Sequence, residues 1–394
     1  MFRNDLIALP PVMKSKKPLW RRLVRGTLVS LTALMASLGV FEVIVRMTTD
    51  TIPPLTVRDA LLGRRYVQAF EKRVYVPEAE REILLRFNEL GFRGDDRPYE
   101  KPEGVKRVAL LGDSMIAALT VEENETAAKL LEAMLNEGDQ ETTWEVMNFG
   151  VSGSSTGQEL VLYREIVSKF DPDVVLCCYF VGNDLADNCR RMTSSPRIYF
   201  ELDENGELEQ QPLAAGRAAL SEALNRHSRL YLWCKETERK LKRMVRKDKR
   251  MQSSNWIYCT QESEDVAYAW KLSEALIHEL ADEVREDDVE FGLVVIPCAP
   301  QIYDDYFAEI SEPAGELAAS FDQDYPTRKL SGFCSSWKIP MLVMTESFRA
   351  AAPSHSRAVE SEWLFHDGKV HFNVKGNQLA ANEMHSFMAT NFVH

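Results

Sequence analysis

The sequence predicts an α/β protein of three layers, in which helices cover both faces of a mostly parallel five-stranded sheet, together with an N-terminal transmembrane helix. Three observations lead to this fold class. Short apolar runs alternate with helical patterns from residue 107 onward, polar clusters follow several of those runs, and a separate apolar segment lies near the N-terminus. The alternation matters most, because parallel strands need crossover connections that are usually helical.

The expected strands are, in order, 107–113, 144–149, 173–180, 290–297 and 339–345. Between the third and fourth of them lies an insertion, at about 186–265. It contains a predicted hairpin at 199–208, where Asn205-Gly206 marks the turn, and helices follow. Because the insertion emerges beside Asn183, we expect it to form a lid or a specificity element.

The first strand runs directly into Gly112-Asp113-Ser114-Met115. A hydroxyl group at such a strand-to-helix turn is exposed at the carboxyl end of the sheet. Its backbone N–H lies at a helix N-terminus, where negative charge is favoured. The motif therefore suits a nucleophilic serine, although Gly-Asp-Ser also occurs in ordinary turns and that alternative stays open for the motif taken alone.

Three further polar clusters lie either directly after a predicted strand or directly before a predicted helix. The small-residue loop 150–157 follows the second strand, and Val181-Gly182-Asn183-Asp184 follows the third. Near the C-terminus, His371-Phe372-Asn373 precedes a helical run. In an open α/β sheet such loops gather at one edge, which is the usual place for a functional site.

With these four blocks in this order and context, the chain resembles the SGNH, or GDSL-type, hydrolase superfamily. The matching residues are Ser114, Gly153, Asn183 and His371. The flanking blocks Asn88–Gly94 and Asp171–Asp173 match as well, so the resemblance extends from about Asn88 to the C-terminus. It implies a flavodoxin-like sheet and the activity of a serine hydrolase on carboxylic esters.

The resemblance also implies roles for the four residues. Ser114 would attack the ester carbonyl, and His371 would accept the serine proton and later return it. The backbone N–H groups of Ser114 and Gly153 and the side-chain amide of Asn183 would form the oxyanion hole. Asp113 and Asp184 are better explained as residues that brace their turns. The histidines and cysteines show no metal-ligand spacing, and neither a metal ion nor another cofactor is expected.

One position departs from the family pattern. An aspartate usually lies three residues before the histidine, but residue 368 is glycine, and Asp367 lies four residues before. We expect the Asp367 carboxylate to reach the His371 ring across Gly368. The alternatives are a Ser-His dyad oriented by a backbone carbonyl, or degraded activity. His366 is interpreted as a surface or supporting histidine.

The N-terminal region predicts a membrane location. A basic tail at 1–25 precedes an apolar run at 26–45, which is long enough to cross a bilayer as an uncleaved signal anchor. A cleaved signal or a buried helix is the alternative. The positive charge favours a cytoplasmic N-terminus and an extracytoplasmic remainder. A stalk and lead-in segment follows at 46–105, where Ile52-Pro53-Pro54-Leu55 resists regular structure, and the hydrolase domain occupies 106–394.

The charge distribution agrees with this division. The chain has a net charge of −13, of which the first 25 residues contribute +6 and the rest −19. An acidic domain of this kind does not suggest nucleic-acid binding. The exception is the basic stretch 235–250, for which a solvated amphipathic helix is predicted, with contact to anionic lipid or polysaccharide as the alternative.

Together these features predict a membrane-anchored serine esterase that acts outside the cytoplasm on an acyl ester. Its substrate would be an acylated polysaccharide or lipid, such as an O-acetylated envelope polysaccharide. An acyltransferase that passes the acyl group to a polysaccharide hydroxyl is the nearest alternative. A non-catalytic binding or scaffolding domain that retains the fold is the other.

Overall fold

The computed structural model describes residues 19–48, 54–137, 142–193, 195, 197–213, 223–225, 227–245, 253–368 and 370–393. The chain divides into two compact units. The N-terminal unit comprises Met1–Pro53 and Arg217–Lys247, and the sheet unit comprises Pro54–Gly216 and Asp248–His394. The middle of the predicted insertion therefore belongs with the N-terminal helix and not with the sheet.

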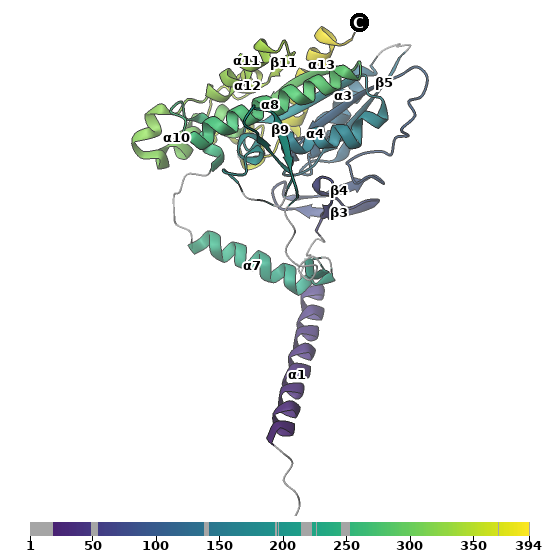
Figure 1. Ribbon diagram of the computed structural model, residues 1–394, viewed down its shortest axis with the longest axis vertical. Helices are drawn as coiled ribbons and strands as arrows, with labels where there is room; N and C mark the ends of the chain where they lie inside the picture. Colours follow the sequence, from purple (N-terminus) through teal and green to yellow (C-terminus); the bar gives the residue numbers. More distant parts are fainter. Residues whose placement is uncertain are drawn as a thin grey trace, which may run out of the picture. The chain divides into compact units, whose positions relative to one another are not determined.

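The sheet unit contains a five-stranded, fully parallel sheet of order β11-β10-β7-β5-β6 (Figure 1). Its strands are β5 (Val105–Gly112), β6 (Thr143–Gly150), β7 (Val174–Phe180), β10 (Glu290–Ile296) and β11 (Met341–Val343). Numbered along the chain this order is 2-1-3-4-5, the flavodoxin-like arrangement, so both the fold class and the five predicted strands are confirmed. The crevice where the strand order reverses lies between β5 and β7.

Helices cover both faces of this sheet. On one face α3 (Ala127–Leu135) packs against α13 (Val374–Asn391), and on the other α4 (Thr156–Glu165) packs against α8 (Glu264–Glu286) (Figure 1). Each strand residue of β7 is buried, as expected for a strand covered on both sides. The remaining helices are α2 (Ser114–Ala117), α5 (Asp184–Asn188), α9 (Ala299–Ile302), α10 (Asp304–Ser311), α11 (Tyr325–Ser336) and α12 (Thr345–Ala351). Short 3₁₀ turns occur at Glu123–Glu125, Val167–Phe170, Ser253–Tyr258, Glu312–Ser320, Glu360–Glu362 and His366–Gly368.

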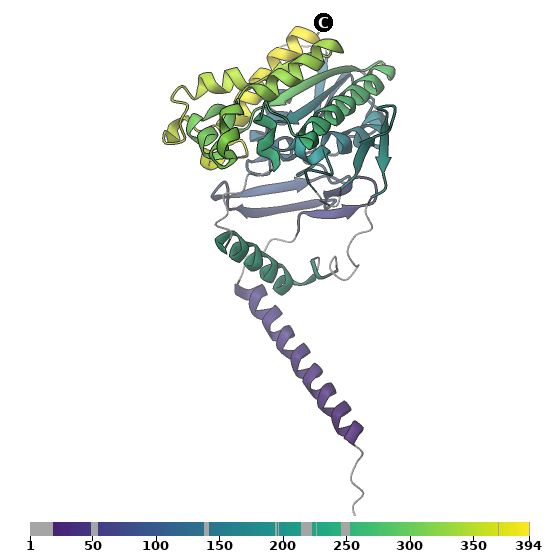
Figure 2. The same ribbon diagram turned by 60° about the vertical axis from the view of Figure 1, so that its left-hand side comes forward.

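The segment before the sheet is more regular than the sequence suggested. It forms two antiparallel hairpins, β1 (Thr56–Asp59) with β2 (Gly63–Tyr66), and β3 (Phe70–Val76) with β4 (Arg81–Phe87) (Figure 2). In β4 the side chains of Ile83, Leu85 and Phe87 are buried while alternate positions are not. The sequence hides this two-residue period because Leu84, which lies between Ile83 and Leu85, is apolar as well.

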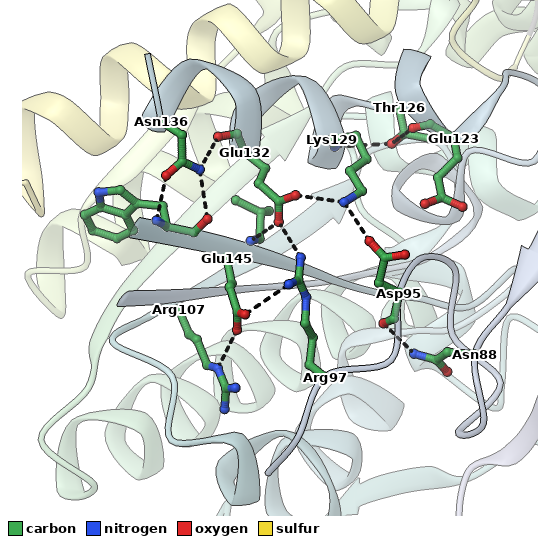
Figure 3. A network of polar contacts seen from close by, with 12 residues as sticks. Asn88, Asp95, Arg97, Arg107, Glu123, Thr126, Lys129, Glu132, Asn136 and Glu145 are labelled. Carbon is green, nitrogen blue, oxygen red and sulfur yellow. Dashed lines mark hydrogen bonds and ion pairs between the residues drawn. The ribbon is translucent and has the colours of Figure 1, made fainter. Parts of the chain in front are cut away.

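Charged side chains connect the lead-in segment to the sheet edge (Figure 3). Arg97 bridges the carboxylates of Glu132 on α3 and Glu145 on β6. Glu145 also accepts from Arg107 Nε at 2.9 Å, and the Arg107 side chain is fully buried. Because an unpaired buried charge is costly, each member of this network holds its neighbours in place. The chain between Gly94 and β5 is thereby fixed along β6.

The predicted hairpin in the insertion is confirmed, with β8 (Tyr199–Leu202) paired to β9 (Leu208–Gln211). The N-terminal unit contains α1 (Leu19–Thr48) and α7 (Arg229–Val245). Within α1, the stretch Leu23–Thr48 is long and apolar enough to cross a membrane, by length and composition. Most of the predicted basic tail, residues 1–18, lies outside the described residues.

Candidate active site

Ser114 lies at the turn between β5 and α2, as the motif predicts. Asp113 caps the short helix, because its Oδ1 accepts the backbone N–H of Met115 at 2.8 Å. The turn packs closely against the end of β6. A Cβ atom at Gly150 would lie only 2.3 Å from the backbone nitrogen of Ala117, so this close approach requires glycine.

Arg93, in the Asn88–Gly94 block, supports the same turn through hydrogen bonds to backbone carbonyl groups. The guanidinium group of Arg93 is buried and donates to the backbone carbonyls of Ala117, Ala118 and Val121, at 3.2 Å to the first and 2.6 Å to the last. Burial lowers the Arg93 pKa to about 10, which still leaves the group charged at neutral pH. Arg93 therefore donates to carbonyl groups at and just after the end of α2, where intrahelical donors are missing, and the Ala118 carbonyl also accepts the backbone N–H of Val121 at 3.3 Å.

His371 joins Ser114 to a carboxylate that no sequence motif identifies. The Nε2 atom of His371 lies 3.0 Å from Ser114 Oγ. On the other side of the ring, Nδ1 lies 2.8 Å and 2.9 Å from the two carboxylate oxygens of Glu78. The backbone N–H of His371 also donates to Glu78 at 3.3 Å. These three side chains have the hydrogen-bond geometry of a nucleophile, a base and an orienting acid.

Glu78 lies in the turn between β3 and β4, in the segment expected to be a stalk. The place beside Nδ1 that the sequence predicted for Asp367 is thus occupied by a residue 293 positions away from His371 along the chain. Asp367 itself lies in the 3₁₀ turn His366–Gly368, with a left-handed φ of 51°. No motif surrounds Glu78, so no local signal in the sequence distinguishes it from the other glutamates.

The contact between His371 and Glu78 shifts the pKa of both groups. Burial alone would lower the pKa of His371, but the hydrogen bond and negative charge of Glu78 outweigh it, and the His371 pKa is raised above 6.5. Burial alone would raise the pKa of Glu78, but the hydrogen bond and charge of His371 outweigh that and lower it. Glu78 is therefore ionised at neutral pH and stabilises the imidazolium form of His371.

Gly153 and Asn183 lie at the same edge of the sheet as Ser114. In the strand register, Gly112 of β5 is level with Gly150 of β6 and Cys178 of β7, so the loops after all three strands begin side by side. Gly153 has a φ of 72°, which favours glycine. The Asn183 amide donates to the Asp187 carboxylate at 2.9 Å. Both residues are half-buried, as are Ser114 and His371.

The β1–β2 hairpin and the neighbouring acids support these loops. The hydroxyl of Tyr66 lies 2.6 Å from Ser152 Oγ and accepts the Ser152 backbone N–H at 2.9 Å, which fixes the residue before Gly153. Asp184 accepts the backbone N–H of Phe180 at 2.7 Å. The prediction that Asp113 and Asp184 brace their turns is therefore confirmed. His366 donates its backbone N–H to the carbonyl of His371 at 2.8 Å, and so supports the loop that carries His371.

The chain is similar to several solved structures at low sequence identity. No family model and no curated protein matches the sequence. Among solved structures, an acetyl xylan esterase covers 71% of this chain and 98% of its own, at 14% identity and a TM-score of 0.40. An acetylxylan esterase from Geobacillus stearothermophilus covers 73% and 96%, at 13% identity and a TM-score of 0.40. A lipase/acylhydrolase from Enterococcus faecalis covers 72% and 96%, at 14% identity and a TM-score of 0.38.

The sheet order, with helices on both faces of the sheet, gives this chain the three-layer α/β/α architecture that the resemblance in sequence implies.

Proposed function

We propose that this protein is a serine esterase that cleaves an acyl ester through Ser114, His371 and Glu78. The observation that carries the proposal is the continuous chain of contacts from Ser114 Oγ to His371 Nε2, at 3.0 Å, and from His371 Nδ1 to the Glu78 carboxylate, at 2.8 Å. A serine hydroxyl is a weak nucleophile until a neighbouring base removes its proton. This arrangement supplies that base and holds it in the required orientation.

The first step is the attack of Ser114 Oγ on the ester carbonyl carbon. As the C–O bond forms, His371 Nε2 takes the serine proton, and the carbonyl oxygen acquires negative charge. Glu78 stays ionised and stabilises the imidazolium at Nδ1. We assign the backbone N–H groups of Ser114 and Gly153, together with the Asn183 amide, as the donors to the oxyanion. His371 then returns its proton to the leaving alcohol, and an acyl-serine remains.

Water completes the hydrolysis by the same steps. His371 takes a proton from the attacking water, the oxyanion forms again, and collapse releases the carboxylic acid and free Ser114. Replacing water by a sugar hydroxyl would make the protein an acyltransferase. The chemistry is identical until this second step, so the two activities differ in what occupies the acceptor position.

We further propose that α1 anchors the enzyme as a single membrane span with a cytoplasmic N-terminus. The apolar length of Leu23–Thr48 supports a span, and the basic residues that precede it support this orientation. An extracytoplasmic esterase would meet acyl esters of envelope polysaccharides or lipids. We propose an O-acetylated polysaccharide as the substrate class.

The experiment uses full-length protein in detergent with p-nitrophenyl acetate, alongside Ser114→Ala. The wild type should release nitrophenol catalytically, and the alanine variant should be inactive while its circular dichroism stays unchanged, because removing a hydroxyl at a half-buried turn leaves no core cavity. Near wild-type rates in the variant would exclude Ser114 as the nucleophile. If neither protein turns over any acyl ester, the scaffolding alternative is favoured.

A second arm adds a polysaccharide acceptor. Free acetic acid as the only product that contains the acetyl group supports hydrolysis. An acetylated polysaccharide, detected by mass spectrometry and absent with Ser114→Ala, supports the transferase alternative.

A further inference from the structure

The N-terminal unit contains an acidic residue in an unusual place. Glu42 lies within the apolar stretch Leu23–Thr48, where a carboxylate without partners would be costly in hydrocarbon. It lies six residues before the end of α1, which is about 9 Å along a helix that rises 1.5 Å per residue. Glu42 is therefore near the end of the proposed span, and its partners explain why a carboxylate is tolerated there.

Those partners are the first residues of α7. Glu42 accepts the backbone N–H groups of Arg229 and Leu230, each at 2.9 Å, and the hydroxyl of Ser228 at 2.8 Å. A carboxylate at a helix N-terminus satisfies donors that lack intrahelical partners and interacts favourably with the helix dipole. Arg46 completes the contact, because it pairs with Glu42 at 2.7 Å and donates to the carbonyl of His227.

This contact fixes the beginning of α7 at the end of α1 (Figure 1). Since the end of a membrane span lies at the membrane surface, α7 begins at that surface. The helix is 17 residues long, or about 25 Å. It is therefore long enough to run along the surface for a distance close to the thickness of the hydrocarbon core.

The sequence of α7 is amphipathic. Leu230, Trp233, Cys234, Thr237 and Leu241 fall on one face of a helix of 3.6 residues per turn. The side chains of Trp233 and Leu241 are 45% and 52% exposed, so the described part of the N-terminal unit does not cover them. The helix also contains six basic residues against two acidic ones, which complements an anionic surface.

From these observations we infer that α7 is an interfacial helix that binds an anionic lipid surface, with Glu42 of α1 as its tether. The inference rests on the proposed membrane anchor but not on the esterase activity. The occupant of the apolar face is the bilayer itself. The same bilayer would surround α1, and the contact through Glu42 joins the two apolar surfaces. The helix would keep the enzyme at the lipid surface, beside membrane-bound substrates.

Cys234 provides a probe on the apolar face, because it is exposed while the other six cysteines are buried. Full-length protein is labelled at Cys234 with an environment-sensitive fluorophore and incorporated into nanodiscs. One set of discs contains phosphatidylcholine alone, and the other also contains phosphatidylglycerol. Cys234→Ser measures background labelling. Cys234→Ser combined with Glu236→Cys moves the label two residues along the helix, about 160° around its axis from position 234, as a matched control.

In discs that contain phosphatidylglycerol, the label at Cys234 should shift to the blue, and its quenching by aqueous iodide should fall at least about threefold below that of the label at position 236. Leu241→Glu should abolish the difference. The protection should be weaker in phosphatidylcholine alone. If both labels are equally accessible to iodide in both kinds of disc, the inference is wrong. A response to a soluble anionic polysaccharide instead of to lipid would overturn it as well.

The tether has its own test. Glu42→Leu removes the acceptor while leaving α1 more apolar, so insertion is retained. Hydrogen exchange at the N–H groups of Arg229 and Leu230 should become at least about tenfold faster, while exchange in β7 stays unchanged. Unchanged exchange at α7 would exclude the tether. Failure of the wild-type protein to copurify with nanodiscs would refute the membrane anchor, and with it the inference, whether or not the esterase assay succeeds.

Discussion

The parallel sheet and the β3–β4 hairpin supply the residues that contact opposite sides of the His371 ring. In the proposed site the sheet supplies the reacting side, because Ser114 lies at the end of β5 and contacts His371 Nε2. The hairpin, which precedes the sheet along the chain, supplies Glu78 to Nδ1. The first side lies within a recurrent architecture with recognisable motifs, and the second does not. In such a site the orienting carboxylate is defined by its position in space, and any segment that reaches the ring can supply it.

The largest effect on the rate of ester cleavage should come from the contact between His371 and Ser114, which lies at the end of the sheet. His371→Ala should lower the rate of ester cleavage almost as far as Ser114→Ala, on the order of 10⁶-fold, since the members of such a unit act together. His366→Ala should keep most of the activity, because His366 contacts the loop and not Ser114. The measurement is kcat with p-nitrophenyl acetate. The reverse ranking of the two histidines would assign the base to His366.

The next largest effect on the rate should come from Glu78, which the β3–β4 hairpin supplies. Glu78→Gln removes the charge that stabilises the His371 imidazolium, so kcat should fall by up to about 10⁴-fold with little change in KM. Asp367→Asn is the matched control and should stay within about tenfold of wild type. If the Asp367 variant loses more activity than the Glu78 variant, the carboxylate predicted from the sequence is the orienting one. The hairpin would then have only a structural role.

A third variant removes the buried guanidinium group that supports the turn at Ser114. Arg93→Met removes the side-chain donor to the carbonyl groups of Ala117, Ala118 and Val121, and should lower the free energy of unfolding by about 3 kcal/mol. Arg73→Met is the control, because its ion pair with Glu122 is largely exposed and should contribute less than about 1 kcal/mol. Urea denaturation measures both. Equal losses would mean that Arg93 does not hold the serine turn.

The smallest effect is a shift in pH dependence. The reaction needs neutral His371, so the rate should rise with pH through an apparent pKa above 6.5. In Glu78→Gln the negative charge that raises this pKa is absent, and neutral imidazole forms at lower pH. The rising limb should therefore move to lower pH even though the plateau is reduced. If the rate rises over the same pH range in both proteins, Glu78 does not set the His371 pKa.

Periodicity and the motifs at strand ends were sufficient to predict the sheet and the residues at its edge. The five strands, the turn at Ser114 and the sheet-edge position of Asn183 all depend on local patterns that the structure preserves. Glu78 could not be predicted, because its role depends on a contact across 293 residues. The role of Arg93 is similar, since nothing in the Asn88–Gly94 block reveals which carbonyl groups its side chain will meet.

The position of Glu78 also bears on how the protein folds. Contacts between residues far apart in the sequence form slowly, because a long loop must close before they stabilise the chain. Ser114 and its turn can form once the central strands pair, but Glu78 meets His371 only when the first and last parts of the sheet unit come together. Catalytic competence should therefore appear late in refolding, after the sheet has formed. During synthesis, it should appear only once the C-terminal helix has left the ribosome.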